Sequence, residues 1–119
     1  MKDERRTRRR VDLGSALMVR IGDTVWDADC LNASMGGAFL RVHPREPLDV
    51  VALLGRSGSL GLEQASGSDT LVIDAAFIVV RAESTGPYPK PFLLGVRFRD
   101  LDMETSLRLF TLIRWQEEV

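Results

Sequence analysis

The segment TLVIDAAFIVVR, residues 70–81, is long, mostly apolar and rich in Val and Ile. β-Branched and aromatic side chains fit the pleated, half-buried surface of a sheet. We therefore predict that this segment is a central β-strand, and that its neighbours in the sequence decide what kind of sheet it joins.

Shorter segments on both sides of this strand alternate between apolar and polar residues, as half-buried strands do. In the first of them, the side chains of Leu17, Val19 and Ile21 fall on one face, and Gly22-Asp23 follows as a tight-turn signal. The predicted flanking strands are SALMVRI (15–21), TVWDADCL (24–31), GAFLRV (37–42) and FLLGVRFR (92–99). Short strands separated by turn signals are typical of a small antiparallel barrel.

The strand predicted over residues 24–31 has two chemically different faces. Trp26, Ala28 and Cys30 alternate on the apolar face, where Cys30 is expected to be a small core residue. Asp27 and Asp29 lie on the opposite face and are expected to be solvated.

Residues 48–64 are ambiguous. LDVVALL (48–54) fits either a strand or a helical turn, while Leu60 and Leu62 fit an alternating strand. The Gly/Ser patches GRSGS (55–59) and SGS (66–68) are expected to be turns and loops.

The apolar period changes near the end of the sequence. Met103, Leu107, Phe110 and Ile113 recur at three- and four-residue steps and form one helical stripe, with Asp102 in place to cap the helix N-terminus. We predict a helix at about 103–117 that covers an open end or side of the barrel.

Composition indicates one domain with a local excess of positive charge. The 119 residues are 45% hydrophobic and carry a net charge of -1. Residues 1–10 contain six basic and two acidic residues, a net charge of +4, so the remainder carries about -5. This distribution predicts a basic arm at 1–12, flexible without its ligand, followed by a folded domain at 13–119.

The single cysteine cannot form an internal disulfide, and no signal peptide or apolar run of membrane-spanning length is visible. We expect a cytoplasmic protein without a membrane span. No nucleophile–base pair, metal cluster or phosphate-binding loop pattern is present in the sequence, so we expect neither an enzyme nor a metal or cofactor.

The arginines of the arm are suited to an anionic ligand that contains guanine. An arginine fork can bind a phosphate through two hydrogen bonds, or guanine through its O6 and N7 acceptors. Arg6 and Arg10 are four residues apart, so one helical turn or a tight bend would bring both to one ligand. Taken alone, such an arm is most often only solvated or a weak nucleic-acid binder.

The polar stretch NASMGG (32–37) could complement the arm. Asn32 can read the edge of a base, and Ser34 can donate to a phosphate or accept from a purine. Gly36 and Gly37 allow the backbone to approach a ring closely. The stretch lies just beyond the strand predicted to end at Leu31, although taken alone it is more often a turn than a site.

Together, in this order, the two motifs resemble the PilZ domain, a bacterial receptor family for cyclic di-GMP. That family pairs an RxxxR arm with a downstream [D/N]xSxxG, which Arg6, Arg10, Asn32, Ser34 and Gly37 match here. GAFLRV, GVRF (95–98) and the amphipathic tail also resemble the family. An alternative register of the arm, from Arg5 to Arg9, fits RxxxR as well.

The resemblance implies a mainly β fold: a six-stranded antiparallel PilZ-like barrel with a C-terminal helix and a flexible basic arm that clamps cyclic di-GMP. Arg6 and Arg10 would meet guanine and phosphate, and Asn32 and Ser34 would meet the guanine edge. Gly37 would keep the barrel surface clear.

Arg5 resembles the arginine found before the motif in members that take an intercalated ligand dimer, which favours two nucleotides here. Arg41 follows the second motif closely enough to reach the ligand, and Arg9 is a further candidate through the alternative register.

The function expected from these features is that of a receptor or adaptor, in which the arm rearranges and signals to a downstream protein, in processes such as motility or biofilm formation. One alternative is a module of the same fold that docks on motility or secretion machinery without nucleotide. Another is a nucleic-acid-binding barrel, which is disfavoured because the barrel is acidic and shows no row of exposed aromatic residues.

Overall fold

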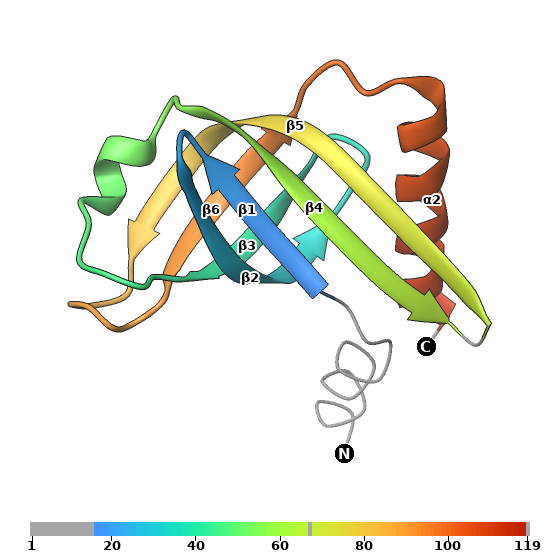
Figure 1. The fold of residues 1–119 in the computed structure, drawn as a ribbon. Helices are drawn as coiled ribbons and strands as arrows, with labels where there is room; N and C mark the ends of the chain where they lie inside the picture. Colours follow the sequence, from blue (N-terminus) through green and yellow to red (C-terminus); the bar gives the residue numbers. More distant parts are fainter. Residues whose placement is uncertain (1–15, 67, 119) are drawn as a thin grey trace.

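The residues that the structure describes fold into a closed six-stranded antiparallel barrel, followed by an α-helix near the C-terminus (Figure 1). The computed structural model describes residues 16–66 and 68–118. The strands are β1 (Ala16–Ile21), β2 (Thr24–Ala33), β3 (Gly37–His43), β4 (Ser57–Ser66), β5 (Asp69–Ser84) and β6 (Phe92–Phe98), with a 3-10 helix η1 (Val50–Leu53) and the helix α2 (Met103–Glu118). Their order around the barrel is β1-β2-β3-β6-β5-β4, so the six-stranded antiparallel barrel that the family resemblance implies is confirmed.

The strand predicted from residues 70–81 is β5, which has 16 residues and borders both β4 and β6. Its inward positions are Ile73, Ala75, Phe77 and Val79, all buried. Because the sheet closes on itself, each of the six described strands is paired with two neighbours, and none of them lies at an edge.

Apolar side chains from all six strands meet inside the barrel. Phe77, Leu40 and Leu94 are fully buried, and Trp26 packs edge to face on Phe92 with ring centroids 5.6 Å apart. The face formed by Leu17, Val19 and Ile21 is buried as the alternation predicted. The interior is thus a filled core, which places any ligand site on the outer surface or at the rim.

The 3-10 helix η1 and the helix α2 cover the two ends of this core. Val50 and Leu53 of η1 are buried at one end, and Leu109 and Leu112 of α2 at the other. Residues 48–54, ambiguous in the sequence, therefore contain a 3-10 turn rather than a strand.

The patch GRSGS was expected to be a loop, and this is wrong from Ser57 onward, where β4 begins. Gly58 is a packing residue: a Cβ there would lie 2.4 Å from the Arg20 carbonyl oxygen and 2.9 Å from the Phe77 ring. Of the two glycines in this patch, it is Gly55, with a φ of 82°, that has the backbone of a turn glycine.

The apolar stripe that identified α2 is not the face that packs on the barrel. Asp102 caps the helix as expected, accepting a hydrogen bond of 2.7 Å from the Thr105 N–H. Leu109 and Leu112 are the buried side chains, whereas Met103, Leu107 and Phe110 are exposed and Ile113 is half-buried. The helix carries two apolar stripes, and periodicity alone does not say which one faces the core.

We expect Leu109→Ala to lower the free energy of unfolding by about 2–5 kcal/mol, because it removes a buried side chain and leaves a cavity. Leu107→Ala is the matched control on the exposed face, with an expected change within about 0.5 kcal/mol. Chemical denaturation of dilute protein measures both. Equal losses in the two variants would contradict the orientation of α2.

Candidate ligand-binding site

The stretch NASMGG forms the end of β2 and the connection to β3. The Ser34 N–H donates to the Gly37 carbonyl at 2.8 Å, and the Ser34 hydroxyl oxygen accepts from the Gly36 N–H at 3.3 Å. The hydroxyl also lies 3.5 Å from the Gly37 carbonyl oxygen, to which it donates. Ser34 therefore shapes the turn with its own side chain and remains exposed to solvent.

A β-bulge decides which way Asn32 points. Cys30 is paired with Leu40 and Asn32 with Phe39, so Leu31 is an extra residue in β2. Without it, Asn32 would continue the inward series of Trp26, Ala28 and Cys30; with it, Asn32 faces outward and is exposed. The strand extends to Ala33, so Asn32 belongs to β2 itself rather than to a loop after Leu31.

The two glycines of the turn have different structural roles. A Cβ on Gly37 would lie 2.1 Å from the Val96 carbonyl oxygen of β6, whereas a Cβ on Gly36 would meet only the Ser34 hydroxyl, at 4.0 Å. The Phe98 N–H donates to the Gly36 carbonyl at 2.9 Å. Gly37 is thus required by the approach of β6, and Gly36 leaves open surface beside Ser34.

A row of residues across four strands extends the surface from Asn32. The register pairs Asn32 with Phe39, Phe39 with Gly95, and Gly95 with Arg81. A second bulge, at Val80 of β5, turns Arg81 to the outer face. Because Gly95 has no side chain, the Arg81 guanidinium reaches over it to lie 5.4 Å from the centre of the Phe39 ring.

Arg97 also borders the turn. It is exposed, and it is paired with Gly37 in the β3–β6 register. Within the described ranges it has no ion-pair partner, whereas Arg81 is paired with Glu83. The sequence alone does not mark Arg81 or Arg97 as site residues, because only the pairing register places Arg81 in the cross-strand row of Asn32 and Arg97 opposite Gly37.

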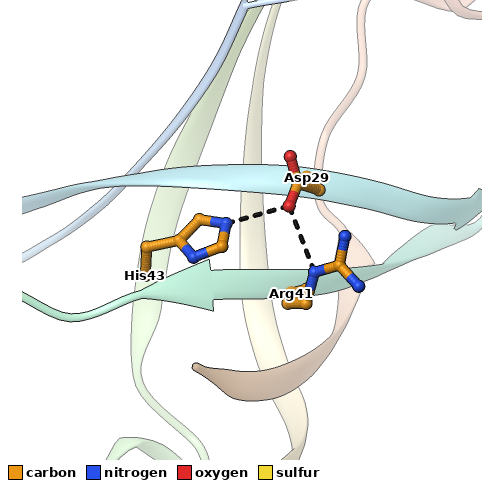
Figure 2. Close-up of polar contacts among 3 residues, drawn as sticks. All are labelled: Asp29, Arg41 and His43. Carbon is orange, nitrogen blue, oxygen red and sulfur yellow. Dashed lines mark hydrogen bonds and ion pairs between the residues drawn. The ribbon is translucent and has the colours of Figure 1, made fainter. Parts of the chain in front are cut away.

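Arg41 lies two positions after Phe39 on the same outer face and is held by Asp29 (Figure 2). Its Nε donates to Asp29 Oδ2 at 3.1 Å, and His43 Nε2 lies 2.8 Å from the same oxygen. Partial burial raises the pKa of Asp29, but the hydrogen bonds and charges of His43 and Arg41 lower it by more, so that the pKa lies below its ordinary value. Asp29, expected to be simply solvated, is instead the shared partner of Arg41 and His43.

The described part of the predicted site is therefore assembled at one rim of the barrel: Asn32, Ser34, Gly36 and Gly37 lie together, with Arg41 farther along β3. The predicted arm residues Arg5, Arg6, Arg9 and Arg10 lie outside the described residues. Within the described ranges, no helix is both long enough and apolar enough to cross a membrane.

The sequence matches the PilZ domain profile over residues 4–115. The chain belongs to the PilZ domain family. The match includes the arginines of the arm as well as the β2–β3 turn, and it confirms the resemblance found from the two motifs.

A solved PilZ-like structure has a similar fold. The crystal structure of the PlzA protein of Borreliella burgdorferi in complex with c-di-GMP superposes with a TM-score of 0.55 at 14% sequence identity. The alignment covers 99% of this chain and 58% of that protein, so this PilZ chain corresponds to a little over half of its length. No curated protein sequence matches.

We expect Gly37→Ala to destabilise the PilZ domain by roughly 1–3 kcal/mol, because the new methyl group overlaps the Val96 carbonyl and β6 must move. Gly36→Ala is the matched control, expected to change stability by no more than about 0.5 kcal/mol. Urea denaturation compares the two. A Gly37→Ala variant as stable as Gly36→Ala would refute the close approach of β6.

The lowered pKa of Asp29 predicts an acid-dependent contribution to stability. The ionised carboxylate stabilises the folded state above the unfolded-state pKa of about 3.9, and this contribution is lost as the pH falls through the lower folded-state pKa. We therefore expect the wild-type unfolding free energy to fall more steeply than that of Asp29→Asn below about pH 4. Because the Asp29 side chain is 44% exposed, the difference at neutral pH should be under about 1 kcal/mol.

Urea denaturation across the acid range measures this dependence. Asp27→Asn is the control, because Asp27 is 70% exposed and its contact with Arg45 is 4.0 Å long. We expect it to follow the wild type. Parallel curves for Asp29→Asn and wild type would contradict the prediction.

Proposed function

We propose that this PilZ domain is a receptor for cyclic di-GMP, bound between the arginine arm and the outer rim formed by the β2–β3 turn. The observation that carries the proposal is the outward placement of Asn32 beside Ser34 and two glycines, in a family match that also includes the arm. PlzA, which shares the fold, was crystallised with c-di-GMP, and this agrees with the proposal.

The chemistry of the rim suits a guanine base. The Watson–Crick edge of guanine offers N–H donors, from which the Asn32 side-chain oxygen can accept hydrogen bonds. The Ser34 hydroxyl is exposed two residues further along the chain. The O6 and N7 atoms on the other edge are acceptors for an arginine fork, which we assign to Arg6 or Arg10. Gly36 leaves room for a purine ring to approach the backbone.

The electrostatics of the rim indicate why the arm would be needed. Arg41 and Arg81 are already paired with Asp29 and Glu83, so they add little net positive charge for two phosphates. Arg97 also lies beside the turn, and it has no ion-pair partner among the described residues. Most of the phosphate neutralisation is therefore assigned to the arm, whose first ten residues carry +4.

In this proposal, nucleotide binding orders the arm against the barrel and creates a surface for a downstream protein. Arg5 favours an intercalated nucleotide dimer, with Arg81 and Phe39 available to contact the outer base. We propose a cytoplasmic location and an output in bacterial motility or biofilm formation. The domain acts as a binding module rather than as an enzyme.

We expect Arg10→Ala and Asn32→Ala to weaken cyclic di-GMP binding, the arginine by roughly 1.5–3 kcal/mol, because a charge-assisted contact is lost. This corresponds to more than about a tenfold loss of affinity. Arg20→Ala is the matched control, since Arg20 is an exposed arginine on β1 and its removal changes the net charge equally. Isothermal titration calorimetry gives both affinity and stoichiometry.

Further variants test the finer assignments. If the register of the arm is Arg6 to Arg10, then Arg6→Ala should weaken binding more than Arg9→Ala. A stoichiometry of two nucleotides per chain, reduced by Arg5→Ala, would support the ligand dimer. Wild-type affinity in Arg10→Ala, or no heat with the wild type, would reject the receptor assignment and leave a PilZ domain that acts without nucleotide.

A further inference from the structure

An open groove of about 530 Å³ runs along the outer face of β1, β4 and β5, which lie side by side in the barrel (Figure 1). Part of its floor is Gly61 of β4, where a Cβ would lie more than 4 Å from every described atom outside its own chain neighbours. Met18 on β1 and Val72 on β5 also line the groove, and each is 47% exposed. The missing side chain of Gly61 therefore leaves a slot with apolar sides.

Two carboxylates border the same slot. Asp74 on β5 is directly opposite Gly61 in the register, and Glu63 follows Gly61 by two residues on the same face of β4. Residues in this diagonal relation are about 7–8 Å apart, so Asp74 and Glu63 can bind one group between them. Both are exposed, and neither has an ion-pair partner among residues 16–66 and 68–118.

An arginine side chain suits this slot. Its guanidinium can donate to both carboxylates at once, while its methylene stem packs on apolar surface such as that of Met18 and Val72. Arg20 lines the groove as well, but it is paired with Ser59, about 13 Å along β4 from Glu63. Among the described contacts it forms no ion pair with either carboxylate.

The arm joins the barrel beside the slot. β1 begins at Ala16, which is paired with Glu63. Arg10 precedes Ala16 by six residues, a length of about 20 Å when extended, so the arginine tract at 8–10 can reach the slot. Residues 1–10 carry a net charge of +4, opposite in sign to the two carboxylates. Reach and charge thus both indicate the arm as the occupant.

We propose that, in the absence of nucleotide, an arginine of residues 8–10 docks in this slot with its guanidinium between Glu63 and Asp74. The contact is reversible, because pairs of exposed charges are weak. A further consequence rests on the proposed function: a docked arm is withheld from the nucleotide site. The apparent affinity for cyclic di-GMP is then reduced in proportion to the fraction of molecules whose arm is free.

Trypsin cleavage of the full chain without nucleotide tests the docking, because trypsin cuts after accessible arginines and a docked arginine is protected. Mass spectrometry follows the cuts within residues 8–10. We expect them to be about two- to fivefold faster in the double variant Glu63→Gln/Asp74→Asn than in the wild type. Gly61→Leu should have the same effect without a change of charge, because the new side chain fills the slot.

Asp23→Asn/Glu46→Gln is the matched control, because it removes two exposed carboxylates outside the groove and changes the net charge equally. Its cleavage should match that of the wild type. Circular dichroism melts verify folding, and Gly61→Thr replaces Gly61→Leu if that variant fails to fold.

Unchanged cleavage in both slot variants would overturn the proposal. Faster cleavage in the charge variant alone would also overturn it, because the arm would then be attracted by charge without occupying the slot. Protection that grows with protein concentration would assign the slot to the arm of another copy and overturn the contact within one chain.

Calorimetry with cyclic di-GMP tests the consequence separately. Both slot variants should bind the nucleotide about two- to fivefold more tightly than the wild type, and the control should match the wild type. Faster cleavage without nucleotide binding in any variant would reject the receptor assignment and leave the docking supported. Faster cleavage with unchanged affinity would overturn the competition between the slot and the nucleotide.

Discussion

Closure of the sheet is the constraint on which the rest of this PilZ domain depends. In a closed barrel every strand has one face in the core and one in solvent, and the register of each strand is fixed by two neighbours. A single extra residue in a strand reverses which of the following side chains point into the core and which point to solvent. Leu31 in β2 and Val80 in β5 are such residues, and they bring Asn32 and Arg81 to the outside in the same cross-strand row. The polar rim is thus made by two local interruptions of a regular core.

Two arginines on this outer face form ion pairs with neighbouring carboxylates. Arg41 and Arg81 are each held by a carboxylate from the same face, which fixes their positions but offsets their charge. A doubly charged ligand would therefore gain orientation from the barrel and most of its electrostatic attraction from residues 1–10. Recognition divided in this way makes the proposed site sensitive to whether the arm is in place.

Much of the fold could be predicted from the sequence, because alternation and turn signals are local. Residues 70–81, the inward face of β1 and the Asp102 cap all appear as expected. The features that could not be predicted depend on neighbours distant in the sequence. The bulge at Leu31 exists only in the pairing of β2 with β3. Gly58 resembles a loop glycine in its local sequence, but it is required because Arg20 and Phe77 pack against it. The orientation of α2 depends on which of its two apolar stripes fits the end of the barrel. The motif residues are visible in the sequence, but the strand register that connects them to Phe39, Arg81 and Arg97 is not.

The contact between Gly37 and the Val96 carbonyl also bears on how sequences of this kind are interpreted. The glycine that ends the NxSxxG motif is required here by the barrel itself, so a PilZ domain with this close approach of β6 would need it whether or not it binds a nucleotide. In this chain its presence is explained by the architecture and says little about ligand binding. The Asn32 side chain makes no such contact among the described residues, so under the proposed function its loss would be the better sign of a domain that no longer binds cyclic di-GMP.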